Sequence, residues 1–479
     1  MPHPATMFFL LTVVVVFLSW IFDIYGLSVI NPATGEEIRV QSLLSPEGIR
    51  WFLRNVVKNF TGFAPLGMVI VTMFGIGVAE HSGFIHACIR QGLNKNRMSR
   101  PGIMLIVILL GIISNVVGDA GYIILIPIAA MLFQSVGLHP IAGIITAYVS
   151  VACGFSANLL ISTLDPLLAQ YTQEAAVSAG ISRSNTGTLS NYYFMVASTF
   201  LITGVIYVVL KKYLSPALGT YEGQIRFGGY KQLSSKERRA LFIALVVGLI
   251  YTIIIVIATF SPLGILRGVT GGMTRSPFIA GAIFILSFGA GLMGMVYGFV
   301  SGRYRSDSDV IAGLTQPMKL LAIYFVIAFF AAQMFAFFEF SRLDKCLAIV
   351  GADMLSSVEA PRFITLLLFI VFSGVINLIM VSSTAKWSFM SFIFVPMFAS
   401  MGITPDWTQC AYRIGDSVTN AITPFLFYMP LVLVYMQQYN KKANYAPLLK
   451  HTWRFSLYIF LAWTLLFIIW YLLKLPLGI

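Results

Sequence analysis

The chain has 479 residues, of which 58% are hydrophobic and only 10% are charged, and its mean hydropathy is +0.86. Apolar runs of about 20 residues recur throughout, which excludes a soluble globular protein and indicates a polytopic membrane protein. The net charge of +13 does not indicate nucleic-acid binding, because the lysines and arginines cluster between the apolar runs, as in cytoplasmic loops. Four widely spaced cysteines support neither a disulfide framework nor a zinc site.

The N-terminal run 7–27 is interpreted as a retained first span, because it is too long for the core of a signal peptide. Residues 45–60 place apolar side chains on one helical face and basic ones on the other, after Ser45 as N-cap and Pro46 in the first turn. This pattern predicts an amphipathic helix. It either lies flat at the outer membrane interface or packs on the protein.

Nine complete crossings fit the hydropathy pattern, at 7–27, 62–84, 141–170, 193–210, 240–260, 276–300, 320–341, 405–438 and 452–474. Two further apolar regions, 102–137 and 363–402, each contain two short pieces split by a polar centre. Each piece is too short to span a bilayer, so both regions are predicted to be re-entrant helical hairpins. The expected fold is therefore all-α.

Basic residues test this topology. They concentrate in the loops 85–101, 211–239, 301–319 and 439–451. With nine crossings and two hairpins, all four loops fall on one side, which the positive-inside rule assigns to the cytoplasm. The N-terminus is then cytoplasmic and the C-terminus periplasmic.

Landmarks of the two hairpin regions recur at a nearly constant spacing, which predicts an internal repeat. The matched pairs are Asn115 and Asn377 (377 − 115 = 262), Pro140 and Pro405 (405 − 140 = 265), and Asn158 and Asn420 (420 − 158 = 262). Five crossings separate the two hairpins, so the repeats are expected to be inverted. Inverted repeats with interrupted helices are typical of secondary transporters.

The chain is accordingly divided into five regions. These are the N-terminal spans with the interfacial helix (1–101), the first hairpin and broken helix (102–170), connecting spans (171–362), the second hairpin and broken helix (363–438), and the final span (439–479). Regions two and four would form a transport core, and the other regions a scaffold.

Charged side chains within the apolar sequence are the main functional candidates, because a charge at the bilayer centre costs at least about 2.5–3.5 kcal/mol. Arg413 and Asp416 lie three residues apart, so they share a helix face and could neutralise each other as a structural ion pair. Alternatively, Arg413 binds a substrate carboxylate and frees Asp416 to take a proton. Asp165, just before Pro166, would cap its broken helix or line the cavity.

Four asparagines form a quasi-symmetric set: Asn115, Asn158, Asn377 and Asn420. Their oxygens suit a hard cation such as sodium, although interhelical hydrogen bonds explain them equally well. Asp119, between glycines at the first hairpin tip, is either a further ion ligand or a turn-forming residue.

The tip of the second hairpin, "SSTAKWSF", combines hydroxyl groups, including that of Thr384, with Lys386 and Trp387. Trp387 is either an interfacial anchor or an aromatic face for ligand stacking. Lys386 is interpreted as a snorkelling or salt-bridging lysine. Further along, Pro424 disfavours an unbroken helix through 405–438.

"GAGLMG" (289–294) fits the dinucleotide pattern GxGxxG, but it lies inside an apolar run with no strand before it. Close helix packing is the better interpretation. The sequence contains no HExxH or GxSxG motif and we find no Walker A motif, so catalysis and direct use of ATP lack their usual support.

Four motifs, "SNVVGDAGYIILIP", "GFSANLLISTLDPLLA", "STAKW" and "YRIGDSVTNAITP", occur in this order. With the crossing pattern, they resemble the p-aminobenzoyl-glutamate transporter (AbgT) family along essentially the whole chain. The resemblance implies a homodimer that imports p-aminobenzoyl-glutamate or exports sulfonamide-type antimetabolites, driven by an ion gradient. It assigns transport roles to Asp165, Asn377, Thr384, Trp387, Pro405, Arg413, Asp416 and Pro424, with Thr384 replaced by serine in some relatives.

The sequence therefore predicts a dimeric secondary transporter of the bacterial inner membrane, with a proton or sodium as coupling ion and no other cofactor. Three alternatives remain. A dicarboxylate carrier could use the same architecture, a small-anion channel could use Arg413 for selectivity, and a membrane enzyme would alter its substrate chemically.

Overall fold

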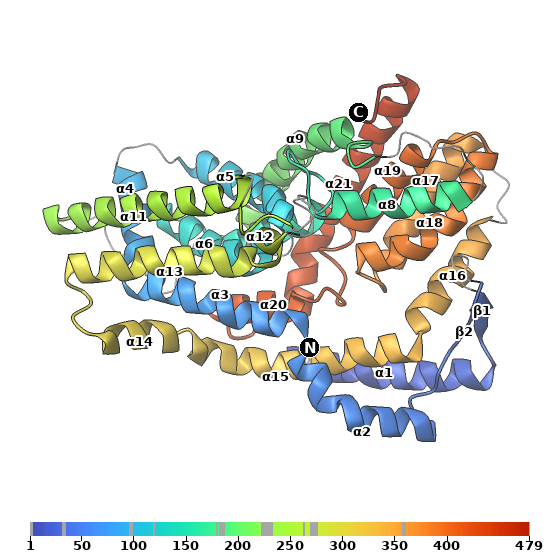
Figure 1. Cartoon of the computed structure of the whole chain (residues 1–479), viewed down its shortest axis with the longest axis horizontal. Coiled ribbons are helices and arrows are strands. Elements are labelled where there is room, and N and C mark those ends of the chain that lie inside the picture. Colours follow the sequence, from blue (N-terminus) through green and yellow to red (C-terminus); the bar gives the residue numbers. More distant parts are fainter. Residues whose placement is uncertain are drawn as a thin grey trace.

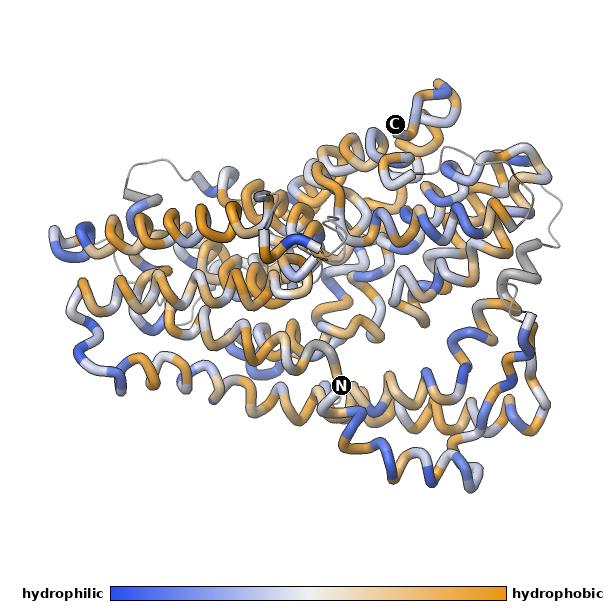
Figure 2. Tube along the Cα trace, viewed as in Figure 1, coloured by the Kyte–Doolittle hydropathy of each residue, from blue (hydrophilic) through white to orange (hydrophobic). Residues whose placement is uncertain are grey.

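The computed structural model of the chain is almost entirely helical (Figure 1). It describes residues 3–30, 35–94, 99–117, 120–178, 181, 187–221, 233–261, 264–268, 276–356 and 361–478. Hydrophobic residues run along most of the length of long helices such as α11 (Ser235–Phe260), and hydrophilic residues gather at their ends (Figure 2). This distribution is the one expected of helices that cross a bilayer.

The N-terminal region contains α1 (Pro4–Ile24), the strands β1 (Ser28–Ile30) and β2 (Glu37–Arg39), and α2 (Pro46–Thr61). The two strands pair in antiparallel fashion. This small hairpin departs from the all-α expectation. Strands of three residues carry too little alternation of polar and apolar side chains to be recognised in a sequence.

Helix α2 packs on the protein, which was one of the two expected arrangements. It begins where the Ser45 side chain accepts a hydrogen bond from the Gly48 N–H at 3.0 Å. Its aromatic face contacts α15 (Met318–Ser341), where Trp51 stacks on Phe340 with ring centroids 4.3 Å apart.

A group of apolar helices lies beside this region (Figure 1). It comprises α3 (Ala64–His81), α4 (Phe84–Asn94), α11, α12 (Pro277–Ala280), α13 (Ala282–Ser301) and α14 (Asp307–Thr315). Helix α13 packs between α3 and α11. A Cβ atom at Gly294 would lie 2.5 Å from the Ala79 Cα, and one at Gly289 would lie 2.8 Å from the Tyr251 ring. The glycines of "GAGLMG" thus serve close helix packing, as predicted.

Two helical units of similar construction occupy the regions predicted to form the internal repeat. The first consists of α5 (Arg100–Ile113), the short 3-10 helix η1 (Ser114–Val117), α6 (Ala120–Ser135), α7 (Pro140–Cys153) and α8 (Leu164–Ser178). The second consists of α17 (Arg362–Asn377), α18 (Ser383–Ser400), α19 (Pro405–Val418) and α20 (Met429–Gln437). Non-helical segments, 154–163 and 419–428, interrupt each unit.

The spacing of equivalent features supports the repeat. Helices α5 and α17 begin 262 residues apart (362 − 100), whereas α7 and α19 begin and end 265 apart (405 − 140, 418 − 153). The turns after α6 and α18 both require a left-handed glycine, Gly137 (φ 73°) and Gly402 (φ 75°), again 265 residues apart. The helical part of the repeat was therefore predictable from these landmarks.

A close glycine–serine contact joins the first and third helices of each unit. A Cβ atom at Gly111 of α5 would lie 2.4 Å from the Ser150 Cβ of α7. In the second unit the residue types are exchanged, and a Cβ atom at Gly415 of α19 would lie 2.6 Å from the Ser373 Cβ of α17. The positions match by the same spacings (373 − 111 = 262; 415 − 150 = 265).

The remaining elements surround the two units. They are α9 (Tyr192–Val209), the π-helical turn η2 (Leu210–Leu214), α10 (Ser215–Leu218), α16 (Leu343–Ser356) and α21 (Tyr445–Leu472). Helix α21 packs against α7, α9 and α19. Every residue of α7 is buried, so the hydrophobic core lies where the two units meet.

Seven helical segments in the described residues are long and apolar enough to cross a membrane. The predicted crossings 141–170 and 405–438 are the interrupted α7/α8 and α19/α20, as their internal prolines indicated. Helices α14 and α16 were not expected. The first is a nine-residue helix capped by Ser306 within a segment whose charges suggested a loop.

Candidate functional site

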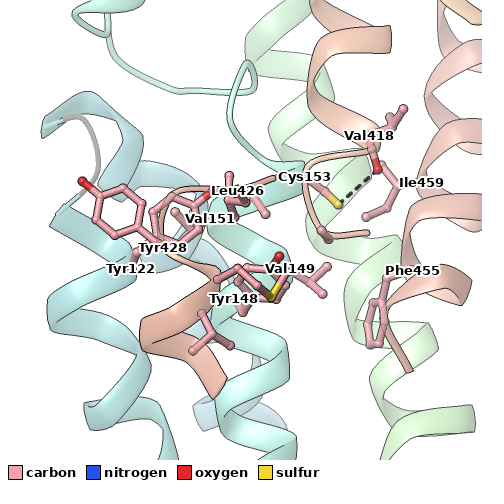
Figure 3. Packing of buried hydrophobic residues seen from close by; sticks show 14 of the residues in the cluster. Tyr122, Tyr148, Val149, Val151, Cys153, Val418, Leu426, Tyr428, Phe455 and Ile459 are labelled. Carbon is pink, nitrogen blue, oxygen red and sulfur yellow. Dashed lines mark hydrogen bonds between the residues drawn. The ribbon is translucent and has the colours of Figure 1, made fainter. Parts of the chain in front are cut away.

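Helix α7 of the first unit contacts the end of α19 and the start of the interruption 419–428 in the second unit. The side-chain amide of Asn420 donates to the Ala152 carbonyl at 3.2 Å, and the Tyr148 hydroxyl donates to the Asn420 carbonyl at 3.3 Å. Beside them the Cys153 thiol contacts the Val418 carbonyl at 3.6 Å (Figure 3). Backbone groups that each broken helix leaves without an intrahelical partner are thus partly satisfied by the other unit.

One buried ion pair joins the two units. The Arg413 guanidinium of α19 donates from Nη1 to the Asp165 Oδ1 of α8 at 2.6 Å. The other Asp165 oxygen accepts from the Ser162 N–H at 2.6 Å and from the Ser162 hydroxyl at 3.0 Å. Asp165, in the first turn of α8, therefore fixes the segment just before the helix and also neutralises Arg413.

A second buried ion pair lies within the second unit. The Lys386 ammonium, in the first turn of α18, is 2.5 Å from the Asp416 Oδ1 of α19 and also donates to the Asn377 Oδ1. The Tyr412 hydroxyl donates to the Ser383 carbonyl at 2.7 Å and lies 3.3 Å from the Asp416 Oδ1. The side chain of Lys386 is fully buried, so the pair ties the start of α18 to α19.

These contacts correct the expectation that Arg413 and Asp416 neutralise each other. Both lie on the buried α19, but in the described residues Arg413 pairs with Asp165 and Asp416 pairs with Lys386. The physical reason is that each charge has a closer opposite charge on a neighbouring helix. The i, i+3 spacing places two side chains on one face but does not decide which partner each one selects.

The asparagines fall into two different environments. The side-chain amide of Asn377 donates to the Thr419 hydroxyl at 3.0 Å and to the Asn420 Oδ1 at 2.8 Å. In the first unit, Asn115 donates to the Val151 carbonyl at 3.1 Å, whereas its own Oδ1 has no hydrogen-bond partner among the described residues. Asn158 is fully buried, and neither of its side-chain polar atoms has a partner in the described part of the chain.

One of the expected symmetric pairs does not occupy equivalent positions. Asn158 lies five residues after α7 ends, whereas Asn420 lies two residues after α19 ends. Their spacing of 262 matches the starts of α5 and α17, but the broken helices follow the spacing of 265. Asp119, the remaining candidate for ion binding, lies outside the described residues.

Trp387 is completely buried in this structure. Its indole N–H donates to the Thr172 hydroxyl of α8 at 2.8 Å, and its ring stacks on Tyr412 with centroids 4.4 Å apart. The position excludes the interfacial anchor that a membrane tryptophan usually provides. Its aromatic face is occupied by Tyr412, so a ligand could stack there only after a rearrangement.

The other predicted residues lie nearby. Thr384 is half-buried in the first turn of α18, and Pro405 is the buried first residue of α19. Pro424 lies in the interruption 419–428, where the preceding polar segment predicted that the helix would break.

Several contributors were not assigned to the site from the sequence. Tyr412, Thr172 and Met195 all contact the predicted charged or aromatic residues, with the Met195 sulfur 3.3 Å from the Arg413 Nη1. Lys386 was noticed but not paired with Asp416. Its place inside an apolar hairpin was the available signal, because a lysine there requires a counter-charge.

A cavity of about 1050 Å³ lies apart from the ion pairs. Its walls come from α2, α15, the start of α16 and the end of the interruption 419–428, and include Trp51, Lys58, Arg342 and Tyr428. Tyr428 stacks on Tyr122 at the start of α6, with centroids 4.9 Å apart. The cavity therefore reaches from α2 to a residue that contacts the first helical unit.

Long apolar helices around two interrupted helical units with buried charges define a multi-pass membrane transporter. The family model described as the AbgT putative transporter family matches residues 1–479, and the chain belongs to this family. It is accordingly a transporter and not an enzyme.

Individual relatives cover nearly the same length. The p-aminobenzoyl-glutamate transport protein of Escherichia coli is 33% identical over 481 residues, covering all of this chain and 93% of the relative. The solved YdaH transporter of Alcanivorax borkumensis is 36% identical with a TM-score of 0.55, and both chains are covered completely. MtrF of Neisseria gonorrhoeae, from a class of antimetabolite efflux pumps, is 36% identical with a TM-score of 0.53, covering 98% of this chain and 95% of that one.

Proposed function

We propose that the protein is an ion-gradient-driven secondary transporter of p-aminobenzoyl-glutamate, of sulfonamide-type antimetabolites, or of both, in the bacterial inner membrane. The relatives named above support this range of substrates. The observation that carries the mechanism is the buried Arg413–Asp165 pair, which joins two helical units at their interruptions.

The pair provides a site for an anionic substrate. Arg413 is 3% exposed, and its Nε has no partner among the described residues. A substrate carboxylate that replaced Asp165 would keep the guanidinium neutralised, while Asp165 would keep its hydrogen bonds from Ser162. Because Asp165 belongs to the other unit, the same exchange would release one unit from the other.

Asp416 is the proposed proton acceptor. One of its oxygens contacts Lys386 and the other has no partner in the described residues. Protonation would remove the charge that holds Lys386, and so would loosen the tip of the second hairpin from α19. Uptake of a proton by Asp416 would thereby weaken the contact between the second hairpin and α19.

Sodium is the second candidate for the coupling ion. The unpartnered oxygens of Asn115 and Asn158 support a cation site in the first unit, since amide oxygens are suitable ligands for a hard cation. Asp119 and Asn420 complete the set of candidate ligands. Alternating access would arise from relative motion of the core that is built from the two inverted repeats with their re-entrant hairpins.

The test is flux of labelled p-aminobenzoyl-glutamate into proteoliposomes, with proton and sodium gradients imposed separately. Uphill movement under the proton gradient that is lost in Asp416→Asn would support proton coupling through Asp416. Uphill movement under the sodium gradient alone would assign the coupling to sodium. If neither gradient moves this substrate in folded protein, dicarboxylates become the next candidates.

The same vesicles separate a carrier from a small-anion channel. A carrier shows counterflow, in which unlabelled substrate inside drives transient accumulation of labelled substrate, whereas a channel lets both equilibrate independently. Counterflow is therefore expected. Its absence, together with conductance of small anions, would favour the channel.

We further propose a homodimer with a cytoplasmic N-terminus and a periplasmic C-terminus. The basic clusters of the predicted cytoplasmic loops support the orientation. A C-terminal fusion to a phosphatase that is active only in the periplasm should be active, whereas the N-terminal fusion should not. Light scattering of the purified protein would give the mass of a dimer.

A further inference from the structure

Lys386 is a second buried cation. In the mechanism proposed above, it does not itself contact a ligand. Its side chain is 0% exposed, and its ammonium is neutralised by the Asp416 Oδ1 at 2.5 Å. The amide of Asn377 is held by Thr419 and Asn420, which directs its oxygen to the ammonium. Removing this second cation from water therefore costs considerable free energy.

The first unit makes the corresponding contact without a charge pair. The spacing of 265 relates the ends of α6 and α18 (400 − 135) and both ends of α7 and α19, and it matches Lys386 with Gly121 (386 − 265) and Asp416 with Val151 (416 − 265). In the first unit these two positions also touch, because a Cβ atom at Gly121 would lie 2.8 Å from the Val151 side chain. The same contact is thus made without any charge.

The two buried ion pairs of the described residues lie close together. Arg413 and Asp416 are three residues apart on α19, and side chains at that spacing have Cβ atoms about 5–6 Å apart. The aromatic stack of Trp387 and Tyr412 lies beside them, with the Lys386 ammonium 5.8 Å from the centre of the Tyr412 ring. Two cations and an aromatic surface therefore share one region.

We propose that Lys386 is a specificity-determining residue that binds a second carboxylate of the substrate, while Arg413 binds the first. In the ligand-free protein, Asp416 neutralises Lys386 and Asp165 neutralises Arg413. The two carboxylates of a dicarboxylate ligand take both places. A ligand with one carboxylate replaces only Asp165. The inference deepens the proposed function, on which it rests, by assigning the site to an aromatic dicarboxylate of the aminobenzoyl-glutamate type.

The test compares ligands that differ by one carboxylate, using purified full-length protein and a direct binding measurement. The first pair is p-aminobenzoyl-glutamate and p-aminobenzoyl-glycine, and the second is glutarate and pentanoate. The variants are Lys386→Met and the charge-neutral Lys386→Met/Asp416→Asn, which avoids an unpaired buried carboxylate. Lys345→Met, an exposed lysine of α16, is the matched control.

Wild type and Lys345→Met should bind the dicarboxylate of each pair more tightly. In the folded Lys386 variants this preference should fall by about tenfold or more, because a hydrogen bond between charged groups is lost. Affinity for the monocarboxylates should change little. An unchanged preference in the double variant would overturn the proposal, since the second carboxylate would then not contact Lys386.

The second ligand pair separates this proposal from the proposed function. If wild type does not bind p-aminobenzoyl-glutamate but prefers glutarate to pentanoate through Lys386, the two-carboxylate site stands and the proposed substrate fails. If wild type shows no preference within either pair, the role of Lys386 is refuted. A double variant that does not fold at all would also refute it, because the uncharged contact of the first unit would then not be a valid substitute.

Discussion

At the scale of residues, the transport core is organised by two buried cations, Arg413 and Lys386, and by the carboxylates that neutralise them. Each carboxylate also accepts hydrogen bonds from hydroxyl or backbone groups. A buried charge that loses its partner is more costly than the pair is favourable, so single substitutions should be more disruptive than paired ones.

Asp165→Asn should lower the free energy of unfolding by about 3–5 kcal/mol, because it leaves the buried Arg413 unpaired. The double variant Asp165→Asn/Arg413→Gln should recover much of this loss. The control is Asp23→Asn, since Asp23 and Arg39 form an exposed pair at 3.9 Å that contributes at most about 1 kcal/mol. Unfolding of detergent-solubilised protein would measure these changes in stability. Equal losses in Asp165→Asn and Asp23→Asn would contradict the prediction.

The contact between Trp387 and Thr172 gives a second prediction. Trp387→Phe and Thr172→Val each remove one end of a buried hydrogen bond, and each should lower stability by about 1–3 kcal/mol. The double variant should be less destabilised than the sum of the two single variants, because the same bond is lost in both. A double-mutant cycle of thermal unfolding would show this coupling, and full additivity would indicate that the bond contributes nothing.

The residue types at this site were predictable, but their pairing was not. Arg413, Asp416 and Asp165 stand out because charges are rare in apolar sequence. The partner of Arg413 lies 248 residues away, and no local pattern encodes that distance. The sequence did not identify the partner of Lys386 for the same reason. Its contact with Asp416 depends on how α18 packs against α19.

At the scale of elements, prolines and polar segments allowed the interrupted helices to be predicted, because they break a hydrogen-bonding pattern that lipid otherwise enforces. The short strands and the helices α14 and α16 were not predicted. They lie outside the regions of strong hydropathy, where local propensity is weak and tertiary packing decides the structure.

The exchanged glycine–serine contacts of the two units can be tested by swapping them. Gly111→Ser should destabilise the protein, because its new Cβ atom would overlap the Ser150 Cβ at 2.4 Å. The variant Gly111→Ser/Ser150→Gly should recover stability, since it reproduces the arrangement of Ser373 and Gly415. Thermal unfolding and elution on size exclusion would compare the variants.

The control for this swap is Gly204→Ser, because a Cβ atom at Gly204 of α9 would meet no atom within 4 Å. That substitution should leave stability unchanged or slightly increased, as expected for glycine replacement in a helix. A double swap that is as unstable as Gly111→Ser would show that the two units do not use equivalent contacts.

At the scale of the whole molecule, the core must move relative to the helices that surround it if it is to open alternately to the two sides. Helix α21 is the neighbour best placed for a test. The Cys153 sulfur of α7 lies 3.9 Å from the Ser456 Oγ of α21, so Ser456→Cys would bring two thiols close enough for a disulfide after a small rotation of side chains.

Oxidation of Ser456→Cys should block flux, and a reducing agent should restore it, because the disulfide would tie α7 to α21. Cys153→Ala/Ser456→Cys, treated with the same oxidant, should keep its flux. Complete cross-linking with undiminished flux would mean that α21 moves together with α7.

The placement of the two ion pairs has a kinetic consequence. Lys386–Asp416 lies within one unit, but Arg413–Asp165 spans both, so relative motion of the units must separate the second pair alone. Without substrate, that separation would leave both Arg413 and Asp165 unpaired, whereas a bound carboxylate keeps Arg413 neutralised and so removes part of the penalty. The empty carrier should thus reorient more slowly than the loaded one, which limits slippage. Substrate supplied on the far side of the membrane should accordingly accelerate efflux, the behaviour known as trans-stimulation.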